Sequence, residues 1–250
     1  MNENEKPGVL IYGRNPVLEA LAGGRTIEKL LIQKNIEGAG KKIYAVAKKA
    51  GVPIRSVEKR DLDRETGVTA HQGVAAYIAD YEYSSLEAIY AYAASRGEPL
   101  FIVLLCGIED PHNLGSIVRS AEGAGAHGVV IPTRRSAAVT PTVIKSSAGA
   151  AVHMRVARAP NMVRCIEELK EKNVWVYGLD MDGVDYHETE FSGAVALAVG
   201  GEGAGLPRLV KEKCDAVVSI PMRGRVASLN AGSAAAIVLY EISYKRAKNQ

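Results

Sequence analysis

The chain has 250 residues, of which 47% are hydrophobic and 24% charged, with a formal net charge of +3. This is the composition of a water-soluble globular protein with room for two modest domains, and no apolar run approaches the ~18 residues of a membrane span. The start lacks the features of a secretory signal, and the three cysteines form no C-x-x-C pair, so neither a disulfide framework nor a metal site is indicated. We expect a cytoplasmic protein without a membrane segment.

The basic residues are unevenly distributed. Lys and Arg outnumber Asp and Glu by 13 to 10 in residues 1–80, whereas residues 81–250 are balanced at 18 to 18. An N-terminal basic excess favours a nucleic-acid partner, but ordinary surface variation explains it equally well.

Helical and strand signals alternate through residues 1–80. Asn15, followed by a proline, is expected to cap a short helix that runs through Leu21. A second helix is expected at 38–50, with one face formed by Ile43, Val46, Ala47 and Ala50, and strands are expected at 27–33, 52–57 and 73–80. We interpret residues 1–80 as a small α/β domain.

A linker with its own helix is expected at residues 81–97. Ser84 or Ser85 caps this helix, which ends at Gly97 ahead of Pro99. The second domain then spans residues 98–250.

Strands and helices alternate along residues 98–250. Strands are expected at 99–108, 127–132, 152–156, 174–180, 194–200 and 217–221, and helices after Asn113, around 141–149 and at 160–172. Near-continuous apolar strands that alternate with helices indicate a parallel sheet covered on both faces. Ligands of such sheets bind beyond the carboxyl ends of strands, which directs attention to the loops after Ile108, Gly200 and Pro221.

Common nucleotide-binding motifs fail in these loops. Gly123, Gly125 and Gly128 spell G-x-G-x-x-G, but they close a helix and precede a strand, which is the reverse of the dinucleotide fingerprint. In the loop after Gly200, Leu206 occupies the place of the third glycine. A nucleotide-dependent oxidoreductase is therefore disfavoured, and no phosphate-loop or nucleophile-elbow motif occurs.

Three segments at strand ends remain, at residues 107–128, 200–207 and 220–241. Taken singly, their glycines permit tight turns, and Asn113 and Ser228 cap the helices that they precede. Taken together and in order, they resemble the three motifs of the SpoU family of RNA ribose methyltransferases, of the SPOUT superfamily. The residues are Asn113 to Arg119 with SAEGAG, the run LAVGGEGAGL, and IPM-x-G-x-x-x-SLN ending in LYE.

The resemblance extends to GRNPVLEAL and AHQGVAA, which look like the family's N-terminal substrate-binding domain, a ribosomal-protein-like RNA-binding fold. It implies a deep trefoil knot in the C-terminal domain and a homodimer, for which the small side chains Ala231, Ala234, Ala235 and Ala236 suit close packing. An ordinary buried helix would look the same.

The resemblance also implies an activity, namely methyl transfer from S-adenosylmethionine to a ribose 2′-hydroxyl of structured RNA. The chain looks most like the group that methylates a guanosine of 23S rRNA, although tRNA enzymes share the motifs. A non-catalytic RNA-binding module is a further alternative, which the complete motif set disfavours. The sequence does not indicate whether Arg223 and Arg225 contact RNA.

Site residues follow from the same resemblance. The cofactor-binding positions are Gly200, Gly201, Gly203, Ile220, Met222, Ser228 and Leu229, although Ile220 and Leu229 also suit simple core packing. The catalytic positions are Arg119, Asn113, Glu202, Ser228 and Asn230, and a structural role for Glu202 stays open. A guanidinium is always protonated in proteins, so we expect Arg119 to orient the 2′-oxygen and an RNA phosphate rather than to act as a base.

Overall fold

The computed structural model describes residues 9–23, 27–78 and 81–248. The chain forms two compact units. Unit 1 comprises Met1–Glu82 and Val139–His153, and unit 2 comprises Tyr83–Ala138 and Met154–Gln250. The chain therefore passes between the units three times, and the predicted division at residues 81–97 corresponds to only the first passage.

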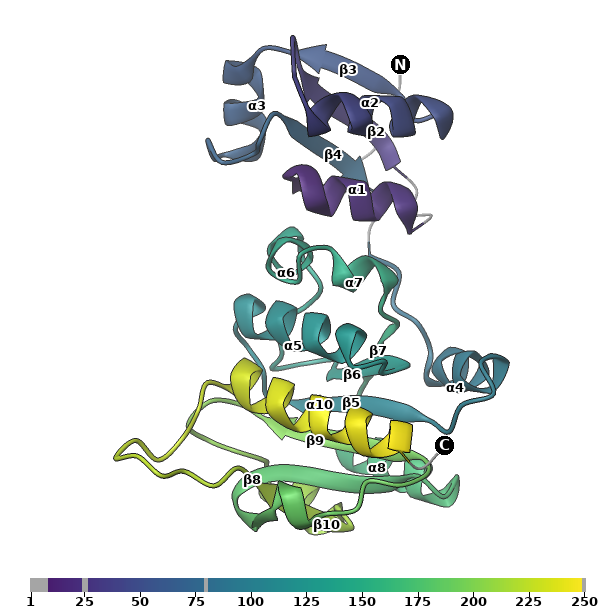
Figure 1. Cartoon of the computed structure of the whole chain (residues 1–250), viewed down its shortest axis with the longest axis vertical. Helices are drawn as coiled ribbons and strands as arrows, with labels where there is room; N and C mark the ends of the chain where they lie inside the picture. Colours follow the sequence, from purple (N-terminus) through teal and green to yellow (C-terminus); the bar gives the residue numbers. More distant parts are fainter. Residues whose placement is uncertain (1–8, 24–26, 79–80, 249–250) are drawn as a thin grey trace. The chain divides into compact units, whose positions relative to one another are not determined.

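Unit 1 is built on a four-stranded sheet of order β1-β4-β2-β3 (Figure 1). Strands β1 and β2 run antiparallel to β4, and β3 runs parallel to β2. The elements are β1 (Val9–Tyr12), α1 (Arg14–Ala22), β2 (Ile27–Gln33), α2 (Ala39–Lys49), β3 (Ile54–Val57), α3 (Lys59–Thr66), β4 (Val74–Ile78), α6 (Pro141–Ser146) and α7 (Ala150–His153).

Two predicted helices of this unit differ in detail from the structure. Helix α1 begins at Arg14 with Gly13 as its N-cap, so Asn15 lies inside the helix and does not cap it. In α2, Ile43 and Ala47 are buried, whereas Val46 is 36% exposed and Ala50 is also exposed. The last two residues of the strand expected at 73–80 lie outside the described residues.

Helices α6 and α7 belong to unit 1 although their sequence lies between two strands of unit 2. Val143 and Ile144 of α6 are buried. A Cβ atom on Gly149 would lie 2.5 Å from Cγ of Glu19 on α1, and His153 Nε2 lies 2.5 Å from Glu19 Oε2. The strand expected at 152–156 is wrong at its start, because α7 occupies that position and the next strand begins at Val156.

Unit 2 is built on a six-stranded sheet of order β10-β8-β9-β5-β6-β7, in which every strand pair is parallel, as predicted. Its elements are α4 (Leu86–Ser95), β5 (Phe101–Cys106), α5 (Pro111–Gly123), β6 (Gly128–Pro132), β7 (Val156–Ala159), α8 (Met162–Glu171), β8 (Trp175–Asp185), the 3₁₀ helix η1 (Tyr186–Glu188), β9 (Val195–Gly200), α9 (Arg208–Lys213), β10 (Ala216–Ser219) and α10 (Ala231–Lys248).

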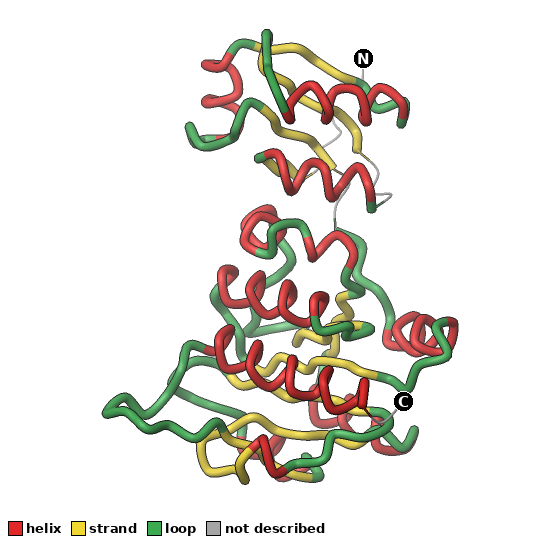
Figure 2. The backbone as a smooth tube through the Cα atoms, viewed as in Figure 1, coloured by secondary structure: helices red, strands yellow, loops and turns green. Residues whose placement is uncertain are grey.

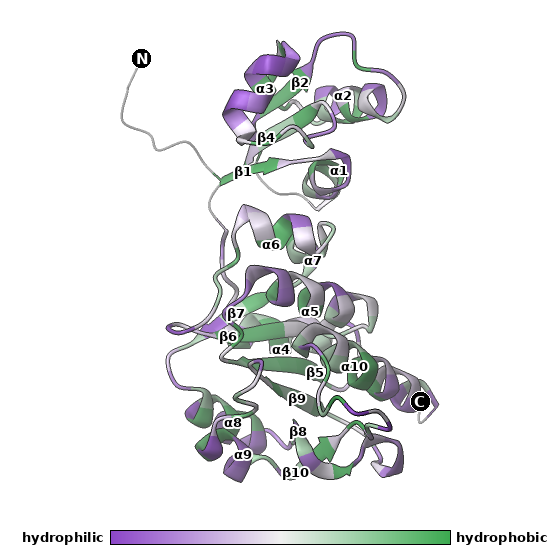
Figure 3. Cartoon of the chain, turned by 90° about the vertical axis from the view of Figure 1, so that its left-hand side faces the viewer, coloured by the Kyte–Doolittle hydropathy of each residue, from purple (hydrophilic) through white to green (hydrophobic). Residues whose placement is uncertain are grey.

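Helices cover both faces of this sheet, whose strands are largely hydrophobic (Figure 3). All six residues of β5 are buried, because successive side chains point to opposite faces and both faces are covered. Ile102, Leu104 and Cys106 share a core with residues of α4, α8 and α9. Helices α5 and α10 pack against each other on the other face (Figure 1). The α/β fold with a parallel sheet is as predicted, and the knot stays a prediction.

Polar caps determine where two helices begin in unit 2. Ser85 caps α4 as predicted, since its hydroxyl accepts a hydrogen bond from the Ala88 N–H at 3.2 Å. Asp110, rather than Asn113, caps α5, because its carboxylate accepts from the His112 N–H at 2.9 Å. In the part of the chain that the structure describes, no helix is long and apolar enough to cross a membrane.

Candidate active site

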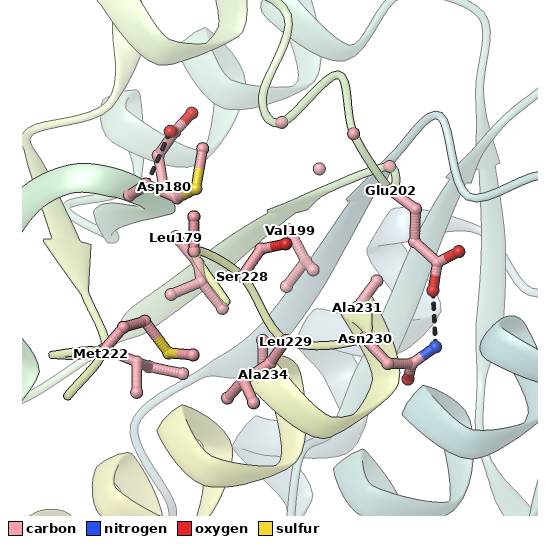
Figure 4. Close-up of a pocket in the computed structure, with 17 residues that line it drawn as sticks. Leu179, Asp180, Val199, Glu202, Met222, Ser228, Leu229, Asn230, Ala231 and Ala234 are labelled. Atoms are coloured by element: carbon pink, nitrogen blue, oxygen red, sulfur yellow. Dashed lines mark hydrogen bonds between the residues drawn. The ribbon is translucent and has the colours of Figure 1, made fainter. Parts of the chain in front are cut away.

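A cavity of about 490 Å³ lies at the carboxyl ends of β9 and β10 and beside the middle of β8 (Figure 4). Its volume is in the range of roughly 300–1,000 Å³ that is usual for small-molecule sites. The lining residues come from three strand-end segments and the start of α10, and they are Leu179, Asp180, Met181, Val199, Gly200, Gly201, Glu202, Gly203, Gly205, Ile220, Met222, Ala227, Ser228, Leu229, Asn230, Ala231 and Ala234. All seven predicted cofactor-binding residues are among them.

Glycines shape the loop after β9. A Cβ atom on Gly200 would lie 2.1 Å from the carbonyl carbon of Gly205, and one on Gly201 would lie 2.4 Å from the carbonyl oxygen of Gly107. The loop closes on itself through a hydrogen bond from Gly205 N–H to Gly201 O at 3.1 Å. Gly203 and Gly205 have φ values of +74° and +62°, which favour glycine. Backbone therefore forms this wall of the cavity.

Three polar side chains from three separate motifs meet at the edge of the cavity. Asn113 Nδ2 donates to Glu202 Oε1 at 3.1 Å, and Asn230 Nδ2 lies 2.8 Å from Asn113 Oδ1 and 2.5 Å from Glu202 Oε1. Asn230 also caps α10, because its Oδ1 accepts from the Gly232 N–H at 3.0 Å and the Ser233 N–H at 3.2 Å. The cluster thus joins the start of α10 to α5 and to the glycine loop. Figure 4 shows the contact between Asn230 and Glu202.

The segment between β10 and α10 is a long exposed loop (Figure 2). Met222 is 38% exposed and Leu229 is 39% exposed, and both line the cavity. Simple core packing therefore does not describe Leu229, whereas Ile220 is half-buried. Ser228 lines the cavity but does not cap α10, since that position belongs to Asn230. Arg223 and Arg225 are exposed in the same loop.

Arg119 is the predicted catalytic residue that the structure does not bring to the cavity. It lies on the exposed side of α5, in the second half of that helix. Six residues at 3.6 per turn separate Arg119 from Asn113 by about 120° around the helix, so the two side chains leave it in different directions. Asn113 is 93% buried toward Glu202, whereas Arg119 is not among the residues that line the cavity.

Asp180, in the middle of β8 beside the cavity, was missed from the sequence. Its Oδ1 accepts from the Met181 N–H at 2.7 Å, and its Oδ2 accepts from the Leu206 N–H at 3.3 Å, which ties β8 to the end of the glycine loop. Lys211 Nζ lies 3.4 Å from Asp180 Oδ2 and also contacts Asp182. The hydrogen bond to Asp182 is the main cause that raises the pKa of Lys211. The sequence did contain a feature that could have indicated Asp180, because this residue ends the apolar segment expected as a strand at 174–180.

The fold places a cavity of small-molecule size where α/β enzymes bind their ligands, beyond the ends of parallel strands. Comparison with known proteins makes the class specific. Residues 100–240 match the SpoU rRNA Methylase family, and residues 10–84 match the domain described as RNA 2′-O ribose methyltransferase substrate binding. The chain belongs to the SpoU family of RNA methyltransferases.

Individual relatives cover nearly the whole chain. The Bacillus subtilis protein YacO, assigned to the TrmH family of tRNA/rRNA methyltransferases, is 44% identical over 239 residues, which is 94% of this chain and 95% of that protein. A TrmH-family relative from Staphylococcus saprophyticus is 43% identical over 240 residues, covering 95% of this chain and 96% of that protein.

Solved structures show the same fold. The SpoU methyltransferase AviRb from Streptomyces viridochromogenes, in complex with AdoMet, superposes with a TM-score of 0.81 at 26% identity, over 96% of this chain and 90% of that one. The AdoMet-bound rRNA methyltransferase from Sinorhizobium meliloti gives 0.76 at 26% identity, over 94% and 87%. The predicted family and the predicted class of enzyme are confirmed.

Proposed function

We propose that this chain transfers a methyl group from S-adenosylmethionine to a ribose 2′-hydroxyl of structured RNA, with a guanosine of 23S rRNA as the preferred substrate and a tRNA nucleotide as the alternative. The observation that carries the proposal is the meeting of Asn113, Glu202 and Asn230 at the edge of a cavity of cofactor size. An RNA substrate also favours action in the cytoplasm.

The cavity suits S-adenosylmethionine. Backbone from Gly200 to Gly205 forms one wall, so main-chain groups can approach adenine and ribose closely. Leu229 and Met222 add exposed apolar surface, and Ser228 adds a hydroxyl. When bound, the cofactor supplies a methyl group on a sulfonium, whose sulfur keeps the electron pair of the broken C–S bond.

The protein must position the 2′-oxygen in line with that C–S bond and remove the hydroxyl proton. The ribose oxygen gains the methyl carbon, and water or an RNA phosphate accepts the proton. We assign the orientation of the oxygen and of an adjacent phosphate to Arg119, whose planar fork matches phosphate geometry. Because Arg119 is exposed on α5 and outside the cavity lining, this assignment requires bound RNA to extend from the cavity to α5. Asn113, Glu202, Ser228 and Asn230 are proposed to hold the loops and the ribose.

Arg119→Ala tests this assignment. We expect nearly unchanged S-adenosylmethionine affinity by calorimetry and a methyl-transfer rate lower by a factor of about 10²–10⁴, which is typical of a positioned electrostatic or proton-transfer group. Arg119→Lys should restore little, because an ammonium cannot replace a planar fork. Arg164→Ala, on the exposed face of α8, is the control. Near-normal single-turnover rates in Arg119→Ala would remove this residue from the mechanism.

Unit 1 is proposed to dock the RNA. It contains a second cavity of about 670 Å³ whose lining is mostly polar and includes Arg14, Lys59, Asn35 and Gln72. Asn35 and Gln72 are both left-handed with φ of +56°, a conformation that is costly outside glycine and concentrates at ligand sites. Gln72 is fixed there, because its Oε1 and O accept hydrogen bonds from Arg14 N and Nε at 3.0 and 3.3 Å.

The substrate itself is best identified in cells. Maps of 2′-O-methyl groups in rRNA and tRNA, with and without this protein, should differ at one site or a few. A loss confined to 23S rRNA supports the preferred substrate, and a loss confined to tRNA supports the alternative. Purified protein that binds RNA but transfers no methyl group to any of these sites would favour a non-catalytic RNA-binding module.

A homodimer is also proposed. Helix α10 exposes Ile237, Tyr240 and Tyr244, which are 37%, 55% and 57% exposed, although another face of the same helix is buried. Such apolar side chains support association with a second copy. Sedimentation that shows only a ~27 kDa species at micromolar concentration would contradict it.

A further inference from the structure

The cavity of unit 2 carries an excess of negative charge. Among the described residues that line it, only Asp180 and Glu202 are charged, and neither Lys, Arg nor His contributes to the lining. An unbalanced charge at a ligand site selects among ligands that differ in charge.

The two carboxylates differ in how far they are compensated. Asp180 lies 3.4 Å from Lys211, which it shares with the exposed Asp182. Two carboxylates around one ammonium leave this group with one net negative charge. Glu202 accepts hydrogen bonds only from the neutral amides of Asn113 and Asn230 in the described part of the chain, both at Oε1. Glu202 is also exposed, so water and these amide dipoles solvate its carboxylate, and no described cation pairs with it.

The cofactor and its product differ in just this property, if the proposed function holds. S-adenosylmethionine carries a sulfonium, whereas S-adenosylhomocysteine is a neutral thioether at the same position. Their adenosine, ammonium and carboxylate groups are identical, so contacts to those groups cancel in the ratio of the two affinities.

We propose that Glu202, assisted by Asp180, makes the cavity selective for the cationic cofactor over its neutral product. Methyl transfer removes the positive charge of the sulfonium, and the attraction between that charge and the carboxylates is lost with it. S-adenosylhomocysteine is therefore held more weakly and is replaced by a new molecule of S-adenosylmethionine. Glu202 is thereby a specificity-determining residue of cofactor exchange. Negative charge at the cavity stabilises the bound cationic cofactor before the reaction rather than the transition state. The proposal is therefore tested by measuring binding and not the rate of turnover.

The expected size follows from Coulomb's law. For an illustrative separation of about 8 Å between two unit charges, effective dielectric constants of about 20 to 80 correspond to a roughly twofold to thirtyfold difference in affinity. Such an interaction weakens with added salt, because the Debye length falls from about 10 Å at 0.1 M to about 3 Å at 1 M. Preference based on the shape of the methyl group would not depend on salt in this way.

Calorimetry with S-adenosylmethionine and S-adenosylhomocysteine tests the proposal on the full chain. The wild-type ratio of the two affinities is expected to favour the cationic ligand and to fall as salt is raised from about 0.05 to about 0.5 M. In Glu202→Gln the ratio should fall by a factor of about 2–30, mainly through weaker S-adenosylmethionine binding. Gln keeps the Oε1 acceptor for both asparagines, and its amide nitrogen replaces Oε2, which accepts no hydrogen bond from the described residues.

Glu122→Gln is the matched control, since Glu122 is exposed on α5 and does not line the cavity. It should leave the ratio unchanged. A wild-type ratio that does not respond to salt, or a Glu202→Gln ratio equal to that of wild type, overturns the proposal while leaving the methyltransferase function intact. If the wild-type protein binds neither nucleoside, the proposed function fails, and this inference fails with it.

Discussion

Gly200 stands where β9 ends and the chain turns back over the cavity. A methyl group there would meet backbone atoms of Gly205 at 2.1 Å, and backbone cannot rotate away as a side chain can. We expect Gly200→Ala to destabilise the fold by about 1–3 kcal/mol, as overpacking does, and to weaken S-adenosylmethionine binding. Denaturant unfolding and calorimetry measure the two effects.

Gly224→Ala provides the comparison, because a Cβ atom on Gly224 meets nothing within 4 Å and its φ is not in the left-handed region. Its stability should remain within about 0.5 kcal/mol of wild type. If the two substitutions reduced stability equally, the close approach of backbone atoms to Gly200 would not be the cause of the destabilisation.

Residue patterns directed attention to the loops after the strands, and the resemblance to the three motifs then named Ser228, Glu202 and the glycines that line the cavity. The direction of Arg119 was not predictable in the same way. A side chain's direction on a helix depends on where the helix starts, and Asp110 rather than Asn113 determines the start of α5. Asp180 was overlooked because its role depends on Leu206, a partner 26 residues away in sequence.

At the scale of elements, the start of β5 depends on a buried histidine. His127 Nδ1 accepts from the Phe101 N–H at 2.9 Å, and its Nε2–H donates to Glu98 at 3.0 Å. Burial lowers the pKa of His127, because a charged ring is poorly solvated there and its Nδ1 could no longer accept. The folded state therefore favours the neutral ring.

This predicts a pH dependence of stability with a definite sign. The unfolded chain takes up a proton on His127 near pH 6.5 while the folded chain does not, so stability is present above about 6.5 and is lost as the pH falls from there toward the lower folded pKa. His127→Gln should cost about 0.5–1.5 kcal/mol at neutral pH and flatten the loss of stability that sets in as the pH falls below about 6.5. Glu98, whose pKa is lowered mainly by its hydrogen bond to Arg96, contributes a separate loss of stability only as the pH falls below about 4.5.

Denaturant titrations across pH measure the effect, with His112→Gln as control because His112 is exposed. If stability depended on pH equally steeply in His127→Gln and in the wild type, this histidine would not be the source of the pH dependence.

Long apolar strands were the elements most accessible to prediction, since burial on both faces leaves an uninterrupted apolar run. Elements with few buried apolar residues were not predicted. Helix α3 buries only Leu62 and is otherwise strongly polar, and β1 and α9 have just four and six residues. The segment after α6 was misjudged because Ala151, Val152 and Met154 are buried apolar residues in either helix or strand.

At the scale of the whole molecule, charge in unit 1 should determine RNA affinity. We expect Arg14→Ala combined with Lys59→Ala to weaken RNA binding and to reduce the salt slope of log K by about two units, one for each lost phosphate contact. Cofactor affinity should not change. Filter binding over a range of salt concentrations, with RNA that the wild type methylates, measures the slope.

Lys48→Ala combined with Arg55→Ala removes the same two kinds of cation from exposed positions of unit 1 that do not line its cavity. Equal loss in both double variants would contradict docking at this cavity. These substitutions are preferable to deletion of residues 1–80, because deletion would expose Val143 and Ile144, which complete unit 1 from elsewhere in the sequence.

A two-part organisation was predictable from the change in pattern near residue 80, but the membership of residues 139–153 was not. Between two strands of a parallel sheet, a short helical segment is ordinarily read as a crossover that covers that sheet. Local sequence does not reveal which core Val143 and Ile144 enter.

That membership has a consequence for the order of events on the ribosome. N-terminal domains generally fold first, while the rest of the chain is still being made. Here the N-terminal unit cannot be completed until His153 has emerged, by which time β5, α5 and β6 of the other unit have already been synthesised. Unit 1 therefore remains incomplete in the nascent chain until its last two helices, α6 and α7, have been synthesised. Both units are completed late in translation.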